Sequence, residues 1–220
     1  MSRRKKHRFE HNIQADNVIE RGKDLYTIIK GKWNEVYFKN DNPIVLELAC
    51  GKGEYSVGLG EIYPDKNFIG IDIKGDRIAR GSKRAIEKGL ANVCFLRAGI
   101  QFIEEFFTDG EVDEIWLINP DPQPRDKEEK RRLTNEKYLS LYSKVLKLNG
   151  LLNFKTDNDF LYKYTLKTLQ NYADFEVTNY TEDLYSSELY SEHYGIKTHY
   201  EELFVEQGHI ISYIKAKKVK

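Results

Sequence analysis

Short apolar runs alternate with longer amphipathic segments through the middle of this chain, and this alternation limits the folds that the sequence can adopt. We predict strands at PIVLELA (43–49), NFIGI (67–71), NVCFL (92–96), DEIWLI (113–118) and GLLNFKT (150–156). Their continuous apolar character is typical of strands that are covered on both faces. Apolar residues also recur at helical spacing over 138–146 and 161–169. The pattern predicts an α/β fold with a mostly parallel sheet between two layers of helices.

The hydrophobic pattern changes in the last part of the chain. FEVTNY (175–180) and HIISYIKA (209–216) are predicted to be two further strands, separated by a long polar insertion that is rich in tyrosine. In an open α/β sheet, such a pair forms an antiparallel edge hairpin. The expected sheet therefore has seven strands and a doubly wound, Rossmann-like topology.

Composition limits the domain organisation and the class of protein. A chain of 220 residues, 40% hydrophobic, has room for one sizeable core. We expect a single domain over 16–216, a basic flexible tail over 1–15 and a basic end at 217–220. No apolar run approaches the roughly 18 residues of a membrane span, and two cysteines are too few for a disulfide scaffold. We therefore expect a cytoplasmic protein without a metal site, either a monomer or a homodimer.

A glycine turn follows the first predicted strand, in the sequence LELACGKGEYS. Gly51 and Gly53 permit a tight turn and a close backbone approach to a ligand, and a helix would begin near Glu54. The dinucleotide fingerprint G-x-G-x-x-G fails at Ser56. The turn alone is equally consistent with a strand-to-helix connection that binds nothing.

Two acidic residues favour a ligand at this turn. Asp72 ends the second strand, roughly 20 residues past the glycines, where an acid can accept the two hydroxyls of a ribose. Glu47 lies inside the first strand, where a dinucleotide site has no use for an acid. A ligand with a sulfonium and an α-amino group would favour a carboxylate there. This pair indicates S-adenosylmethionine, although a surface acid and a buried ion pair would also explain them.

The segment INPDPQPRDKEEKRR (118–132) follows a buried strand and ends in a dense run of charged residues. Its prolines fix the backbone and remove donors, so the segment is predicted to be a stiff, shaped loop. The cations that follow are Lys127, Lys130, Arg131 and Arg132. They fit either a solvated, salt-bridged helix start or a surface that tracks the phosphates of RNA. Because the net charge is zero, with 35 basic and 35 acidic residues, only the distribution of charge can decide between these readings.

Five motifs carry a resemblance to a known family. In order, they are VLELACGKGEYS, NFIGIDIK, WLINPDPQPRDKEEKRRLTNEKYL, LNFKTDN and THYEELF. Their sequence and intervals resemble the bacterial tRNA (guanine-N7)-methyltransferase family over residues 40 to 210. The resemblance implies the class I methyltransferase fold, S-adenosylmethionine as methyl donor and tRNA as partner. It also implies methylation of N7 of a guanine, at position 46 of the variable loop.

The resemblance assigns roles to individual residues. Asp121 would be the active-site acid, close to both cofactor and base. The cofactor would be bound by Glu47, Gly51, Gly53, Asp72, Gly99 and Asp121. The RNA-substrate site would comprise Arg125, Asp157, Thr198, His199, Tyr200 and Glu201.

Four positions depart from the pattern of the family. Ala49 replaces the first glycine of the cofactor loop, Asn119 replaces an apolar residue, Gln123 replaces the usual aromatic residue, and Gly99 replaces an acid. None of these changes removes a proposed catalytic group. The change at Gln123 would cost base stacking, worth about 1–3 kcal/mol where it operates.

Other functions fit parts of the same sequence. NPDP (119–122) partly matches the N-P-P-aromatic loop of methyltransferases that act on exocyclic or amide nitrogens, but Pro122 takes the place of the aromatic residue. A non-catalytic RNA-binding protein that keeps the fold is an alternative of a different class, and the intact Glu47, Asp72 and Asp121 argue against it. A dehydrogenase is disfavoured by the missing third glycine.

Overall fold

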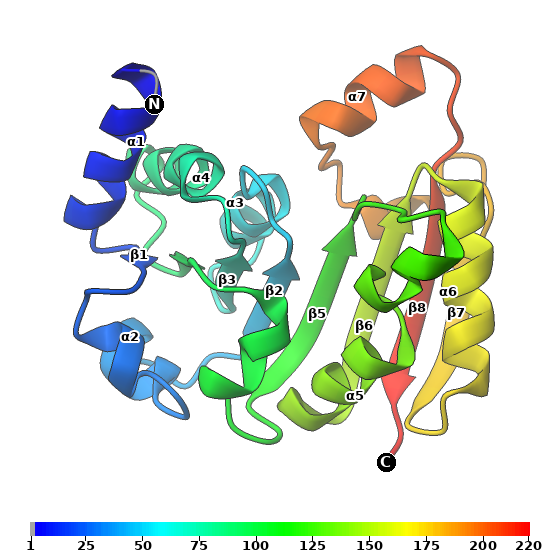
Figure 1. Cartoon of the computed structure of the whole chain (residues 1–220), viewed down its shortest axis with the longest axis horizontal. Helices are drawn as coiled ribbons and strands as arrows, with labels where there is room; N and C mark the ends of the chain where they lie inside the picture. Colours follow the sequence, from blue (N-terminus) through cyan, green and yellow to red (C-terminus); the bar gives the residue numbers. More distant parts are fainter. Residues whose placement is uncertain (1–2) are drawn as a thin grey trace.

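The molecule is built on one eight-stranded sheet with the strand order β1-β4-β3-β2-β5-β6-β8-β7 (Figure 1). The computed structural model describes residues 3–220, apart from the side chains of Arg3, Arg4 and Tyr200. The strands are β1 (Val18–Ile19), β2 (Ile44–Leu48), β3 (Asn67–Ile71), β4 (Val93–Leu96), β5 (Val112–Ile118), β6 (Leu146–Thr156), β7 (Phe175–Thr181) and β8 (Ser212–Lys218). Strands β1 to β6 pair in parallel, whereas β8 runs antiparallel to both β6 and β7.

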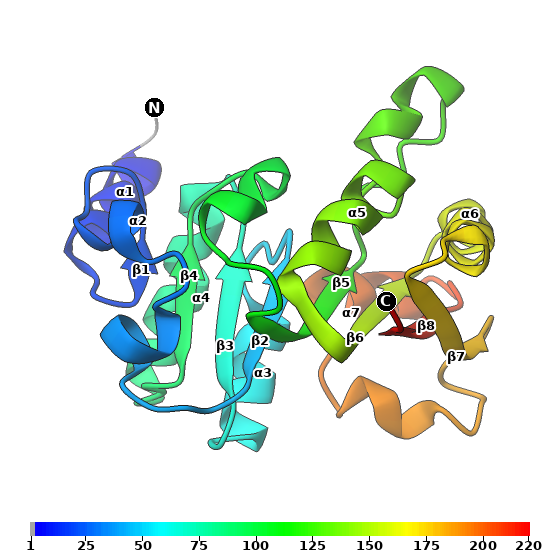
Figure 2. The same cartoon turned by 90° about the horizontal axis from the view of Figure 1, so that it is seen from below.

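Helices cover both faces of the sheet (Figure 2). The α-helices are α1 (Arg3–Gln14), α2 (Leu25–Ile28), α3 (Glu54–Ile62), α4 (Gly75–Glu87), α5 (Glu136–Val145), α6 (Asp159–Asn171) and α7 (His199–Glu206). Shorter turns of other helix types are η1 (Trp33–Phe38), η2 (Ile100–Glu105), η3 (Asp126–Arg131) and η4 (Tyr190–His193).

Alternating side chains of the strands supply two apolar cores. In β2, Leu46 and Leu48 belong to the core beneath α5 and α6, whereas Val45 belongs to the core beneath α3 and α4. Because successive side chains point to opposite faces, Glu47 lies on the same side as Val45. The alternation thus directs one carboxyl group of β2 toward the start of α3.

The seven predicted strands are all present, and the sheet has one strand more. The additional strand, β1, contains two residues and pairs with β4 at the edge of the sheet. A segment this short has no periodic pattern of its own, so the sequence did not reveal it. At the end of the chain, β8 continues to Lys218 and includes part of the predicted basic end.

The prediction of a flexible amino-terminal tail is wrong, because residues Arg3–Gln14 form helix α1, which packs on α4. The buried Asn12 donates a hydrogen bond from Nδ2 to the carbonyl of Gly75 at 2.8 Å. The imidazole of His11 lies 2.8 Å from Oγ of Ser82, and the Arg97 guanidinium lies over the Phe9 ring. The partners of these side chains are more than 60 residues away in sequence, so local composition could not indicate the contact.

The chain order reverses at β2, which pairs with β3 on one side and β5 on the other. The carboxyl ends of these three strands therefore open into one crevice, the usual ligand site of an open α/β sheet. Helix α7 stands over the carboxyl ends of β5 and β6 and forms a wall of this region (Figure 1). No helix of the described part of the chain is long and apolar enough to cross a membrane.

Candidate active site

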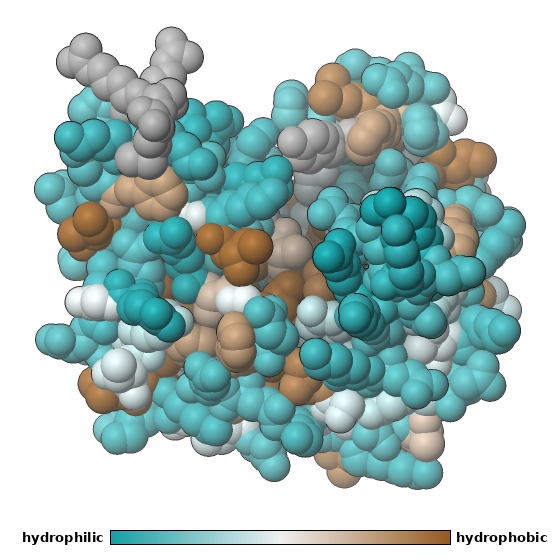
Figure 3. All heavy atoms as spheres, viewed as in Figure 1, coloured by the Kyte–Doolittle hydropathy of each residue, from teal (hydrophilic) through white to brown (hydrophobic). Residues whose placement is uncertain are grey.

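A cleft with two connected compartments lies at the carboxyl ends of β2, β3 and β5. The Glu47 compartment has a volume of about 480 Å³ and extends to α7, and the Asp72 compartment has a volume of about 250 Å³. The space-filling view shows the molecule hollowed between the α4 side and the α7 side (Figure 3). The residues that line both compartments are Ala49, Arg77, Asn119, Pro120 and Asp121. These shared residues form the junction of the cleft.

Glu47 places a buried carboxyl group at the inner end of its compartment. The side chain is 5% exposed, and Oε2 accepts hydrogen bonds from the backbone N–H of Ser56 at 2.7 Å and from its hydroxyl at 2.5 Å. Burial raises the pKa of Glu47 to about 8, although the hydrogen bonds from Ser56 oppose this shift. A positively charged ligand beside this group would favour its ionised form.

Asp72 and Gly51 hold the turn that separates the two strand ends. Oδ2 of Asp72 accepts a hydrogen bond from the N–H of Gly51 at 2.9 Å, and Oδ1 accepts one from the N–H of Lys74 at 2.8 Å. Asp72 also lines its compartment, and each of its carboxylate oxygens can accept a further hydrogen bond. Gly53 lines neither compartment, and its contact with the cofactor stays a prediction. A Cβ there would lie 2.4 Å from the Phe95 ring, so the glycine lets the turn pack on the core.

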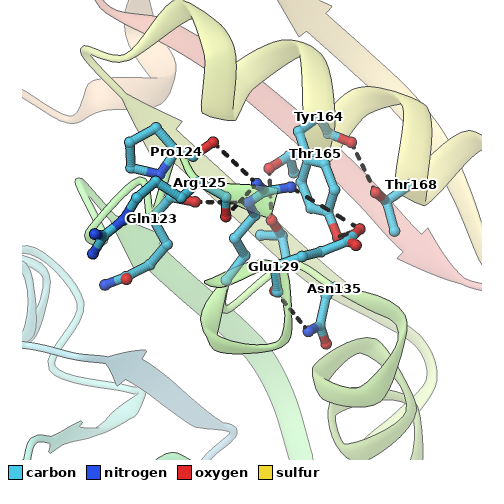
Figure 4. Close-up of polar contacts among 10 residues, drawn as sticks. Gln123, Pro124, Arg125, Glu129, Asn135, Tyr164, Thr165 and Thr168 are labelled. Carbon is cyan, nitrogen blue, oxygen red and sulfur yellow. Dashed lines mark hydrogen bonds and ion pairs between the residues drawn. The ribbon is translucent and has the colours of Figure 1, made fainter. Parts of the chain in front are cut away.

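The proline loop carries Asp121 to the junction of the cleft, where its side chain is exposed. Pro120 and Pro122 line the cleft on either side of it. The loop is held from behind by Arg132, whose Nε donates a hydrogen bond to the carbonyl of Gln123 at 3.0 Å. Figure 4 shows the backbone carbonyls of Gln123, Pro124 and Arg125 around this guanidinium, beside Tyr164 and Glu129.

The predicted contact of Arg132 with the RNA backbone is therefore wrong, because the side chain is buried behind the loop. Its side chain is only 4% exposed, and the guanidinium lies 4.8 Å from the centre of the Phe160 ring and 4.5 Å from that of Tyr164. Tyr164 in turn donates a hydrogen bond to Glu129 at 3.0 Å (Figure 4). The arginine stabilises the shape of the loop, and a run of charges in sequence could not distinguish this cation from its neighbours.

The other cations of this segment remain exposed. Lys127 and Lys130 are exposed on η3, and Arg131 lines the outer part of the Asp72 compartment. Arg125 is ion-paired with Glu128, and its side chain is 66% exposed. These four residues form a basic rim beside the cleft, which we call the η3 rim.

Helix α7 and the end of β6 close the opposite side of the Glu47 compartment. Asp157 and Thr198, both predicted, line it, and so do Asn158 and Phe204, which the sequence reading missed. Thr198 accepts a hydrogen bond from the N–H of Glu201 and so caps α7. Of the other predicted residues, His199 is exposed on α7, the side chain of Tyr200 lies outside the described residues, and Gly99 precedes η2 without lining either compartment.

Glu201 was predicted to contact the substrate, but its side chain does not reach the cleft. Its side chain is fully buried, and Oε1 lies 2.6 Å from Nζ of the equally buried Lys155 on β6. Tyr185 donates a hydrogen bond to Glu201, and Lys155 donates one to the hydroxyl of Tyr55 at 2.7 Å. Burial lowers the pKa of Lys155, and the adjacent carboxylate opposes this shift. The ion pair fixes α7 over the strand ends.

Three of the four departures from the family pattern have a left-handed backbone. The φ angles are 55° at Ala49, 45° at Asn119 and 46° at Gln123. This conformation costs about 1–2 kcal/mol for an ordinary residue, and least for glycine and asparagine. Ala49 and Asn119 line the cleft, so two of these left-handed residues lie where the ligand would bind.

The fold places the chain in a structural class. It superposes on a structure described as an antibiotic related methyltransferase with a TM-score of 0.64 and 19% identity, covering 94% of this chain and 98% of the other. A 16S rRNA (adenine(1408)-N(1))-methyltransferase from Catenulisporales acidiphilia, determined with its cosubstrate SAM, matches with a TM-score of 0.59 and 14% identity, over 86% and 91% of the two chains. Together, the sheet and these superpositions define the fold of the class I methyltransferases.

Sequence comparison identifies the family within this class. A family model described as "Putative methyltransferase" matches residues 41–213. The tRNA (guanine-N(7)-)-methyltransferase of Christiangramia forsetii is 48% identical over 98% of both chains, and that of Cytophaga hutchinsonii is 44% identical over 98% of this chain and 97% of the other. The Lactococcus lactis protein of the same name is 37% identical over 92% and 90%. The chain belongs to the tRNA (guanine-N(7)-)-methyltransferase family.

The buried ion pair under α7 gives a prediction for stability. Glu201→Gln should lower the free energy of unfolding by about 3–5 kcal/mol, because it leaves the Lys155 ammonium buried without a counter-charge. Urea denaturation measures this change. Glu202→Gln, at an exposed position on the same helix, is the matched control and should change stability by less than about 0.5 kcal/mol. Equal stability of the two variants would contradict the role of the ion pair.

Proposed function

We propose that this protein transfers a methyl group from S-adenosylmethionine to N7 of a guanine in tRNA, at position 46 of the variable loop. The observation that carries the proposal is the connected cleft, in which Glu47 lines one compartment, Asp72 lines the other and Asp121 lines both. A ligand with a ribose at one end and a cationic amino acid at the other fits this distribution of acids. Family membership supplies the reaction and the nucleic acid.

The residues of the Asp72 compartment suit an adenosine. Asp72 would accept the two ribose hydroxyls, and the apolar side chains of Ala98 and Ile100 would pack against the adenine. At the other end, Glu47 would lie beside the positive charges of the methionine part. S-Adenosylmethionine supplies an electrophilic methyl group, which these contacts would hold at the junction.

The target guanine would occupy the part of the Glu47 compartment that faces α7. Pro122, Asp157, Thr198 and Phe204 line this part. In this chain, Gln123 replaces the aromatic residue that the proline loop of the family usually carries. The ring of Phe204 would stack on the base instead. Base stacking on an aromatic side chain contributes about 1–3 kcal/mol, so Phe204 could restore what the loop lacks.

Guanine N7 needs little chemical assistance from the protein. The atom has a free lone pair and carries no proton, so in-line attack on the methyl group requires orientation and no general base. Asp121 would accept hydrogen bonds from N1–H and N2–H of guanine and hold the base in line. Positioning two substrates in one cleft can supply most of the acceleration.

The η3 rim would bind the tRNA backbone beside the cleft. Lys127, Lys130 and Arg131 are exposed there, and Arg125 points outward from the same segment. Cations that neutralise phosphates release counterions, so affinity for tRNA should fall steeply as salt is raised.

Base-specific cleavage tests the proposed function. The protein is incubated with labelled S-adenosylmethionine and a tRNA transcript, which is then treated with borohydride and aniline to cut at N7-methylguanosine. A single cut in the variable loop, absent when that guanine is replaced by adenine, is the expected result. Label without cleavage would instead favour methylation of an exocyclic amine, and no label despite cofactor binding would contradict methyl transfer to tRNA.

The raised pKa of Glu47 predicts a proton linkage of cofactor binding. In the free protein the group has a pKa of about 8 and is mostly protonated at pH 7, whereas a bound cation favours the carboxylate. Binding should therefore release up to one proton at pH 7, and affinity should rise with pH by at most about tenfold per unit until about pH 8. Calorimetry in buffers of different ionisation enthalpy measures this release.

Glu47→Gln is the control for this linkage, because the α-amino group of the cofactor also titrates. The difference in proton release between the wild type and the variant isolates the contribution of Glu47. Identical release from both proteins would show that the carboxyl group does not face the cation.

If Asp121 orients the guanine and does not act as a general base, its substitution should cause only a partial loss of activity. Asp121→Asn keeps the shape of the side chain but loses the charge that accepts from guanine, so kcat/KM should fall about 10- to 100-fold with residual methylation at every pH. Single-turnover rates between pH 6 and 9 provide the measurement. If the variant bound tRNA and cofactor normally yet had no activity at any pH, this modest positioning role for Asp121 would be wrong.

A further inference from the structure

The side chain of Asn119 stands out at the junction of the cleft. Asn119 follows β5 directly, and its N–H donates a hydrogen bond to the carbonyl of Lys155 at 2.8 Å. The residue has a φ of 45° and lines both compartments, as does Asp121 two positions later. Its backbone is thus fixed to β6, and the residue lies where the two compartments meet.

The carboxamide of Asn119 is buried without using its hydrogen-bonding capacity. Both Nδ2 and Oδ1 are inaccessible to solvent and have no hydrogen-bond partner among the described residues. In contrast, the fully buried Asn153 donates to Glu114 at 2.8 Å and accepts from Tyr213 at 2.6 Å. Buried amides in folded proteins are normally paired in this way. Asn119 is itself partly exposed, so rotation of its side chain toward the cleft would bring this unpaired amide to a ligand bound there.

The proposed function defines which atoms come near this amide. With a ribose on Asp72 and the cationic end on Glu47, the transferable methyl group must lie between them, at the junction. Guanine N7 must approach the same place, and its neighbour on that edge of the base is the O6 acceptor. A donor that holds O6 orients N7 without occupying the lone pair that attacks.

We propose that Nδ2 of Asn119 donates a hydrogen bond to O6 of the target guanine and thereby positions N7 for methyl transfer. This inference rests on the proposed function. Asp121 can only accept hydrogen bonds, so it suits N1–H and N2–H, which lie next to O6 on the guanine ring. The two side chains, separated in sequence by Pro120, thus match consecutive groups along one edge of the base.

A substrate analogue tests the contact with O6. Single-turnover methylation is measured for tRNA that carries guanine or 2-aminopurine, which lacks O6, at the target position, with the wild type and Asn119→Gly. Glycine accepts the left-handed backbone of this position, so the loop is retained. Loss of O6 should cost the wild type about tenfold more than it costs the variant, the effect of one hydrogen bond. The shared loss of N1–H cancels in this comparison.

A second variant distinguishes the polarity of the contact. Asn119→Asp keeps the shape of the side chain but presents only acceptors to O6, so it should methylate guanine more slowly than Asn119→Gly does. Calorimetry with S-adenosylmethionine should give the same affinity for all three proteins, within about threefold.

Two results would overturn the inference. The first is an equal 2-aminopurine penalty in the wild type and Asn119→Gly, because the amide would then not contact O6. The second is a tenfold or greater loss of cofactor affinity in Asn119→Gly, which would assign the amide to the cofactor. Failure of the proposed function is a separate outcome, since wild-type protein would then give no aniline cleavage of methylated tRNA at all.

Discussion

The arrangement of the cleft depends on the parallel pairing of β2 with both β3 and β5. This pairing brings three strand ends to one edge, so that Glu47, Asp72 and Asp121, which are far apart in sequence, face the same cavity. The alternation of side chains along β2 then directs Glu47 toward the first turn of α3, where Ser56 binds it. A shift by one residue in β2 would turn the carboxyl group to the opposite core.

Two charged side chains that the sequence suggested for RNA binding instead hold the walls of the cleft. Glu201 pairs with Lys155 beneath α7, and Arg132 holds the proline loop through the carbonyl of Gln123. Both groups are almost completely buried. We propose that the exposed cations of the η3 rim contact the RNA backbone, so that binding of the backbone and shaping of the site fall to different residues.

The sequence predicted the features that depend on local pattern. Five continuous apolar runs and two further strand-like segments indicated seven strands. The acids inside the first strand and at the end of the second indicated Glu47 and Asp72, because strand ends converge in any open α/β sheet, whereas Asp121 was assigned from the family motif. The helix at Arg3–Gln14 was not predictable in this way, since its packing depends on Gly75 and Ser82. Lys155 was missed for a related reason: a lysine in a strand has the appearance of a solvent-facing residue until its buried partner on α7 is known.

The proposed function requires one cleft to hold two substrates in adjacent compartments, with the reacting atoms at the junction. A crystal structure of the protein with S-adenosylhomocysteine and guanosine monophosphate would show this arrangement. We expect the ribose on Asp72, the amino-acid end beside Glu47, and the sulfur near Asn119 and Asp121 with N7 of the base facing it. An adenosine bound away from Asp72, or a guanine whose N7 points away from the sulfur, would be incompatible with this arrangement.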